Sequence, residues 1–75
     1  MKLGIYVYEI GIKQTSLDAI DRWLNDRYHV IGYYSEGINL VWIVETKRKP
    51  KDIEQEMSII KKKIGNRIIG VHIVK

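Results

Sequence analysis

The residue types that carry most enzyme chemistry are sparse in this chain of 75 residues. The two histidines, His29 and His72, have no carboxylate nearby at a metal-ligand spacing, and there is no cysteine to act as a nucleophile or zinc ligand. The serines lack a nucleophile-elbow context, and the stretch GIKQTS at residues 11–16 lacks the Gly-Lys-Ser/Thr pattern of a phosphate-binding loop. We therefore predict no catalytic residue, no metal ligand and no cofactor, which favours a binding protein over an enzyme.

Glu9 is the one acid placed for metal chemistry. It lies near the end of the first predicted strand, where a dimer would bring it toward its own symmetry mate. Two carboxylates placed in this way could hold a divalent ion. A metal-dependent nuclease using Glu9 is therefore the enzyme hypothesis, and it ranks behind the binding hypotheses.

The basic residues are more informative because they are unevenly distributed. Residues 1–46 carry four basic and six acidic side chains, a balance of −2, whereas residues 47–75 carry nine basic and three acidic side chains, a balance of +6. This asymmetry favours an anionic partner such as DNA or RNA. The run Lys61 to Lys63 is explained by the dipole of a predicted helix, whose C-terminus favours cations.

Hydrophobic periodicity predicts six elements that position these charges. Residues 2–10 alternate as a strand that Gly11 ends, and Thr15 or Ser16 is expected to cap a helix with residues 17, 20, 23, 24 and 28 on one face. Two β-rich runs, 29–34 and 38–46, flank a hairpin signal at 35–37. A second helix runs from Pro50 to a stop at Gly65, and residues 67–74 form the last strand.

The order β-α-β-β-α-β predicts an α+β, ferredoxin-like two-layer sandwich that forms a single domain over residues 1–75. Its antiparallel sheet has the strand order 4-1-3-2, and both helices cover one face. In this topology the start of the first strand and the ends of the third and fourth meet at one side of the sheet. We name the cations expected there the basic edge: Lys2, Lys47, Arg48, Lys49, Lys51 and Lys75.

Strand parity divides the side chains between the helix-covered face and an open face. A Glu36-Gly37 turn pairs Tyr34 with Asn39, and a three-residue turn would swap the faces of the second strand. We assign the bulkier uncharged set to the helices, namely Ile5, Val7, Ile31, Tyr33, Leu40, Trp42, Val44, Ile69, Val71 and Ile73. The open face then presents Gly4, Tyr6, Tyr8, Gly32, Tyr34, Asn39, Val41, Ile43, Glu45, Ile68, Gly70, His72 and Val74.

This open face is too apolar to face water alone, and it carries three glycines within strands. In one interpretation the rings of Tyr6 and Tyr8 lie over Gly70 and Gly32 of the same chain. In the other, which we favour, a second copy packs there and its tyrosines enter the gaps at the glycines. The predicted dimer or ligand face comprises Tyr6, Tyr8, Tyr34, Val41, Ile43, Ile68, His72 and Val74.

The composition bears on the cellular compartment and on the source of the protein. The absence of cysteine fits a reducing compartment, the first residues read as a strand instead of a secretory signal, and no apolar run is long enough to span a membrane. We therefore expect a cytoplasmic protein with no membrane partner. With 14 Ile and 9 Lys, the chain has a composition seen in proteins from hot environments.

The leading hypothesis is a small, basic, non-enzymatic homodimer that binds DNA or RNA through the basic edge. The topology invites comparison with the RNA-recognition motif, but INLVWIVE at residues 38–45 lacks that motif's glycine- and aromatic-rich signature, which argues against base readout on the sheet. The alternative is a protein-interaction module, acting as a regulator, inhibitor or assembly factor through the open face.

Overall fold

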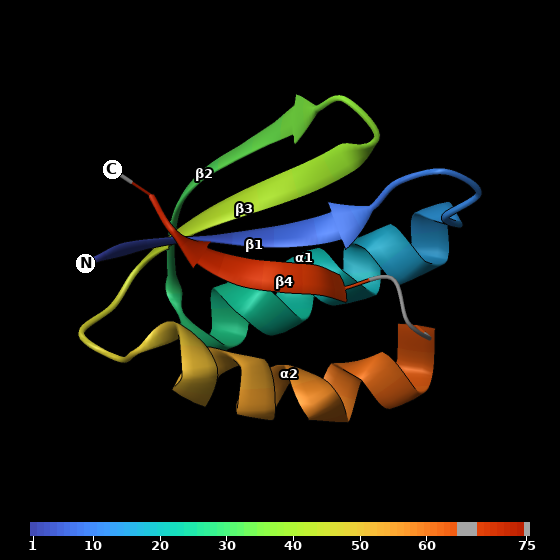
Figure 1. Cartoon of the computed structure of the whole chain (residues 1–75). Coiled ribbons are helices and arrows are strands. Elements are labelled where there is room, and N and C mark those ends of the chain that lie inside the picture. The colour runs from blue at the N-terminus through green and yellow to red at the C-terminus, as the bar shows by residue number, and fades with distance from the viewer. Residues whose placement is uncertain (65–67, 75) are drawn as a thin grey trace.

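The computed structural model describes residues 1–64 and 68–74, with the backbone alone at 60–64, 68 and 69. Its elements are β1 (Lys2–Tyr8), α1 (Gln14–Arg27), β2 (His29–Glu36), β3 (Asn39–Glu45), α2 (Pro50–Ile64) and β4 (Ile68–Ile73). The strands form an antiparallel sheet in the order β2-β3-β1-β4, which is the predicted order read from the other side. Both helices lie on one face of this sheet (Figure 1).

The helix α1 begins earlier than predicted. Its N-cap is Lys13, with φ −77° and ψ 147°, so the prediction of Thr15 or Ser16 as the cap was wrong. No side chain caps this end, and Gln14 instead donates through Nε2 to Asp18 Oδ1 at 2.9 Å one turn later. At the other end Tyr28 is extended and donates its N–H to Leu24 O at 2.8 Å, so the chain passes directly into β2.

The hairpin between β2 and β3 corrects the predicted register. Glu36 pairs with Asn39, so the turn is Gly37-Ile38 and not Glu36-Gly37. Gly37 has φ 61°, which fits the first central position of a type II′ turn and explains why glycine takes that place. Tyr34 consequently pairs with Val41 and not Asn39. This two-residue shift preserves strand parity, so Tyr34 stays on the predicted face.

A bulge in β2 overturns one core assignment. The register shifts between Val30 and Gly32, so that Val30 pairs with Val44 and packs against the core. Ile31, which was predicted to face the helices, is exposed. A bulge adds one residue to one strand and thereby breaks the simple alternation on which the prediction depended.

The core confirms the predicted faces of β1 and β3. Trp42 is fully buried, and its indole Nε1 donates to Asp21 Oδ1 at 2.9 Å, so its one polar group is satisfied. Tyr33 lies against Trp42 with ring centroids 4.7 Å apart but is about half exposed, as is Ile73, so neither is the core residue that was predicted. The buried cluster is Leu3, Ile5, Val7, Ile20, Leu24, Leu40, Trp42, Val44, Ile53, Met57 and Val71.

A second bulge affects the pairing of β1 with β4. Tyr6 lies opposite Gly70, whereas Val7 lies opposite Ile68. The alternation that placed Ile68 on the open face therefore does not continue past this point. The side chains of Ile68 and Ile69 lie outside the described residues, and so do those of Lys61 to Lys63. Within the part of the chain that the structure describes, no helix is long and apolar enough to cross a membrane.

Candidate functional site

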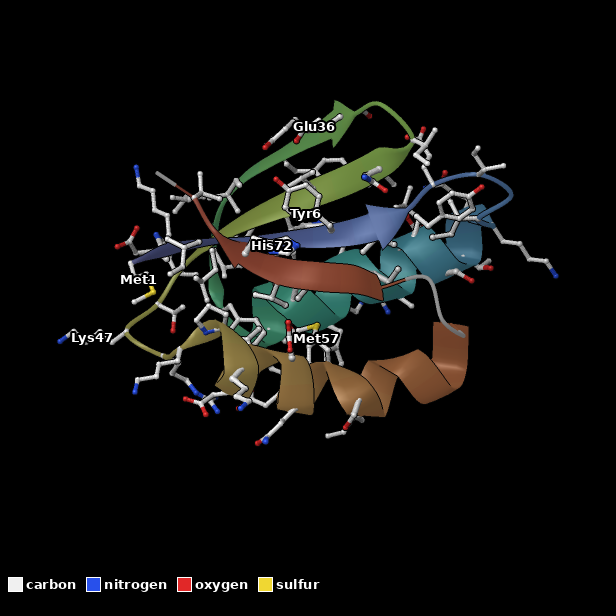
Figure 2. The ribbon with its side chains drawn as sticks, in the orientation of Figure 1. Met1, Tyr6, Glu36, Lys47, Met57 and His72 are labelled. Carbon is white, nitrogen blue, oxygen red and sulfur yellow. The ribbon has the colours of Figure 1, made fainter. Side chains whose placement is uncertain are left out.

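The basic edge is assembled by strand pairing. Lys2 at the start of β1 lies opposite Glu45 at the end of β3, and Thr46 donates its N–H to Met1 O at 2.9 Å. The loop that follows carries residues 47–49, so its cations lie at the same end of the sheet as Lys2. Figure 2 shows Met1 and Lys47 together at this end. Lys75, the sixth predicted member, lies outside the described residues.

The charges of the basic edge are largely uncompensated. Lys2, Lys47, Arg48, Lys49 and Lys51 are all exposed. Among the described side chains, only Arg48 of these five forms an ion pair, through Nη1 to Glu56 Oε1. The four lysines have no carboxylate within ion-pair distance in that set. Four flexible ammonium groups therefore point into solvent from one side of the molecule.

A hollow of about 450 Å³ adjoins this edge between the end of α1 and the first turns of α2. Its walls include the rings of Trp23 and Tyr28 and the guanidinium groups of Arg27 and Arg48. Arg27 lies over the Trp23 ring, 4.3 Å from its centroid, in a cation–π arrangement. Sequence reasoning missed this pair, although the i, i+4 spacing of Trp23 and Arg27 near the end of a helix could have indicated it.

Glu56 organises one wall of the hollow. Its carboxylate accepts hydrogen bonds from the Tyr28 hydroxyl and from Arg48. These hydrogen bonds, the one from Tyr28 foremost, lower the pKa of Glu56 below its usual value of 4.5. Burial, reinforced by the hydrogen bond to Glu56, raises the pKa of Tyr28 well above its usual value. Glu45, which also lines the hollow, forms an ion pair with the N-terminal ammonium of Met1 at 3.3 Å. These two carboxylates therefore pair with Met1 and Arg48 and leave the lysines of the basic edge without an ion pair among the described residues.

The open face covers most of its own gaps. A Cβ atom placed on Gly4 would lie 3.0 Å from Cε1 of Tyr6, and one placed on Gly70 would lie 2.9 Å from Nε2 of His72. Each ring therefore lies over the glycine two residues earlier on its own strand. Gly32 instead lies beside Ile43, at 3.6 Å. Rings of the same chain therefore lie over Gly4 and Gly70, but neither predicted pair is found: the ring nearest Gly70 belongs to His72 and not to Tyr6, and Gly32 has no Tyr8 ring over it.

Tyr6 and His72 occupy diagonal positions on the open face, since Gly4 pairs with His72 and Tyr6 with Gly70. Their ring centroids are 5.4 Å apart with an interplanar angle of 72°. The Tyr6 hydroxyl donates to Glu36 Oε2 at 3.5 Å, and Figure 2 shows these three side chains coming from three strands. Partial burial, followed by the charge of Glu36, raises the pKa of Tyr6 above its usual value. Neutral Tyr6 is thus a hydrogen-bonding group here and no base.

The remaining residues of the predicted dimer or ligand face differ in accessibility. Val41 is fully buried under its neighbours, so it cannot contact another molecule directly. Tyr34 and His72 are exposed, whereas Tyr8, Ile43 and Val74 are half-buried. A partner on this face would therefore meet Tyr34 and His72 first.

Glu9 has no partners for metal chemistry among the described residues. There, no group of three or more His, Cys, Asp and Glu side chains lies close enough to hold a metal ion. The backbone N–H of Glu9 donates to Ile38 O at 2.9 Å, which extends the contact between β1 and β3 by one residue, to the hairpin turn. The hypothesis that Glu9 holds a divalent ion together with its symmetry mate in a dimer stays a prediction.

Comparisons with known proteins yield no relative: no protein-family model, curated protein or solved structure matches this chain. Its function is therefore argued from its own surfaces.

Proposed function

We propose that this protein binds nucleic acid, DNA or RNA, through the basic edge. The observation that carries the proposal is the group of four exposed lysines at one end of the sheet, Lys2, Lys47, Lys49 and Lys51, which have no carboxylate partner among the described residues. Phosphate groups would supply the missing negative charge and would release condensed counterions on binding. Lysine provides a mobile point charge without the planar fork of arginine, so contacts to phosphates and little sequence preference are expected.

We further propose that the fold belongs to the ferredoxin-like class and that the protein acts in the cytoplasm without enzymatic activity. The β-α-β-β-α-β order and the sheet order support the first statement. The absence of cysteine supports the cytoplasm, and the content of Ile and Lys supports a source in a hot environment. Because this fold serves many functions, the proposal of nucleic-acid binding depends on the basic edge alone.

A mobility-shift assay with single- and double-stranded DNA and RNA at two salt concentrations tests the proposal. The double variant Lys47→Glu with Lys49→Glu should weaken binding at least about tenfold and reduce the slope of log K against log salt by about two, since each lost phosphate contact removes about 0.9. The matched control is Lys13→Glu with Arg22→Glu, which makes the same charge change at exposed positions on or beside α1.

Equal losses in both double variants would mean that total charge, and not the basic edge, governs affinity. Failure of the wild-type protein to bind any of the four nucleic acids would reject the proposal. It would favour the alternative, a protein-interaction module, for which the exposed side chains of Tyr34 and His72 on the open face are the supporting observation.

A further inference from the structure

Exposed hydrophobic side chains concentrate on one hairpin. Of the eight large hydrophobic residues that are exposed in the described chain, four lie on β2 or in the turn that follows it: Ile31, Tyr33, Tyr34 and Ile38. The strand β2 is at one side of the sheet and pairs only with β3 (Figure 1). The open face, by contrast, has covered its own gaps at Gly4 and Gly70.

The free side of β2 has one of the usual protections against pairing, the bulge at Val30 to Gly32, and lacks charged residues and proline between Gly32 and Ser35. Edge strands commonly carry lysine, proline or inward-pointing charges, which prevent another strand from adding to the sheet. Residues 30–35, VIGYYS, contain no charged residue and no proline. The strand has eight residues, compared with six in β4 at the opposite side of the sheet. Beyond the bulge, residues 32–35 form a short stretch of ladder that neither a charge nor a proline protects.

The hairpin fixes which backbone groups of β2 point outward. In a two-residue hairpin the closing pair exchanges backbone hydrogen bonds, and such pairs then alternate along the ladder. The closing pair here is Glu36 with Asn39, so Tyr34 and Gly32 also direct their backbone groups toward β3. Tyr33 and Ser35 direct theirs toward the free side, where the sheet ends.

We propose that β2 pairs antiparallel with β2 of a second copy, so that two four-stranded sheets join into one of eight strands. We place the two-fold axis at Tyr33, opposite the partner's Tyr33, because, of the outward-pairing residues, this one brings Tyr34 opposite a glycine. In this register Tyr34 lies opposite the partner's Gly32, and Ser35 lies opposite the partner's Ile31, the residue at the bulge, where the pairing ends. The ring of Tyr34 then covers the glycine, an arrangement that stabilises strand pairs containing glycine.

A second copy fits this strand better than a charged partner. Because residues 30–35 are uncharged, two identical strands meet without like charges facing each other. The two-fold relation makes the contact self-complementary, so the assembly closes at two copies. It also places the two basic edges at opposite ends of the joined sheet, so dimer formation leaves the lysines accessible.

Light scattering on the full chain at tens of micromolar tests the interface. The wild-type protein should have twice the monomer mass, and both Tyr33→Lys and Ser35→Pro should reduce it to the monomer mass. The lysine places two like charges at the two-fold axis, and the proline removes an outward N–H while leaving the ladder with β3 intact. Ile73→Lys is the matched control, because Ile73 is similarly exposed but lies on β4. This variant should stay dimeric.

A cysteine variant reports on the register separately. The chain has no cysteine, so Tyr33→Cys introduces the only thiol. Opposite residues of a hydrogen-bonded antiparallel pair have Cα atoms about 5.5 Å apart, within the range that a disulfide bridges. Mild oxidation should therefore yield a covalent dimer, whereas Ile73→Cys should yield at most a trace.

Three results would overturn the proposal: a monomeric wild-type protein, a dimer that survives both β2 variants, or a dimer lost in Ile73→Lys. A dimer that instead dissociates in Tyr6→Lys with Tyr8→Glu would assign the interface to the open face. Circular dichroism on each variant separates dissociation from unfolding. If Tyr33→Lys unfolds, Ser35→Pro and the oxidation of Tyr33→Cys still decide the matter.

Discussion

The open face and the basic edge are the two surfaces that the sequence singles out, and they differ in whether the chain's own side chains satisfy them. On the open face, side chains of the same chain fill the space above Gly4 and Gly70 and bury Val41 completely. On the basic edge, Lys2, Lys47, Lys49 and Lys51 find no carboxylate among the described residues. Apolar gaps can be closed by a neighbour on the same strand, whereas a cluster of like charges requires an external anion or solvent.

The local arrangement explains how the open face closes. The segments GIY at residues 4–6 and GVH at residues 70–72 both place a ring two residues after a glycine. Since Gly4 pairs with His72 and Tyr6 with Gly70, the two rings occupy one diagonal of a square and the two glycines the other. The absence of Cβ atoms on the glycines is what allows the two rings to lie this close to the backbone.

The largest effect is expected where this closure is tightest, at Gly4→Ala. The new Cβ would meet Tyr6 Cε1 at 3.0 Å and Val74 Cγ2 at 3.1 Å, so both side chains must move. We expect a loss of about 1–2 kcal/mol in the free energy of unfolding, measured by urea denaturation. The matched control is Gly32→Ala, whose Cβ would meet Ile43 at an ordinary 3.6 Å. This variant should gain about 0.5 kcal/mol because alanine loses less backbone entropy.

Equal stability of the two variants would show that the rings do not rest on Gly4, and the open face would then offer the gaps that a partner's rings were first expected to enter. Gly70→Ala should fall between the two. Its Cβ would lie 2.9 Å from Nε2 of the exposed His72 ring, which can turn toward solvent at the cost of its contact with Tyr6.

Much of the fold follows from the sequence because simple alternation and helical periodicity hold through β1, β3, α1 and the described side chains of α2. Ile5, Val7 and Trp42 lie where parity places them. The failures lie where the chain departs from alternation: the bulge at Val30 to Gly32, which exposes Ile31, and the bulge after Tyr6. A glycine within a strand is a sign of a bulge, and Gly32 and Gly70 lie beside these two, but where the register shifts depends on how two strands fit together.

The candidate site likewise has a part that the sequence predicts, the basic edge, and a part that it does not, the hollow. Topology alone was enough to bring Lys2 beside the loop of Lys47, because it depends only on the order of the strands. The hollow was not predicted, since Tyr28 and Glu56 meet across 28 residues and their contact depends on how α2 packs. The partners of a charged side chain are set by tertiary packing, which local patterns do not encode.

A smaller effect is expected at Glu56→Gln, which removes the one carboxylate that Arg48 of the basic edge contacts in the described chain. The variant should lose about 1 kcal/mol of stability at pH 7, since Gln accepts weaker hydrogen bonds from Tyr28 and Arg48 and the site is partly screened by solvent.

The stability difference between wild type and Glu56→Gln should depend on pH. Folding lowers the pKa of Glu56 below 4.5, so its contribution is present above that pH and is lost as the pH falls through the folded-state value. Thermal melts of wild type and variant should therefore differ at pH 7 and converge toward pH 3. A difference that persists unchanged at pH 3 would assign the loss to packing and not to the charge.

The smallest effect is expected at the basic edge itself, for Lys47→Glu with Lys49→Glu. Both side chains are exposed, and neither has an ion-pair partner among the described residues, so their removal breaks no contact that folding creates. The stability should change by less than about 0.5 kcal/mol, and the relief of repulsion within the cluster opposes any loss.

The control pair, Lys13→Glu with Arg22→Glu, also brings the net charge from +4 to zero, so the two double variants do not differ in the effect of net charge on solubility. Urea denaturation of both double variants measures the difference. A loss above about 1.5 kcal/mol confined to Lys47 and Lys49 would show that these lysines stabilise the fold, and their exposed charge would then no longer single out this edge as a surface for phosphates.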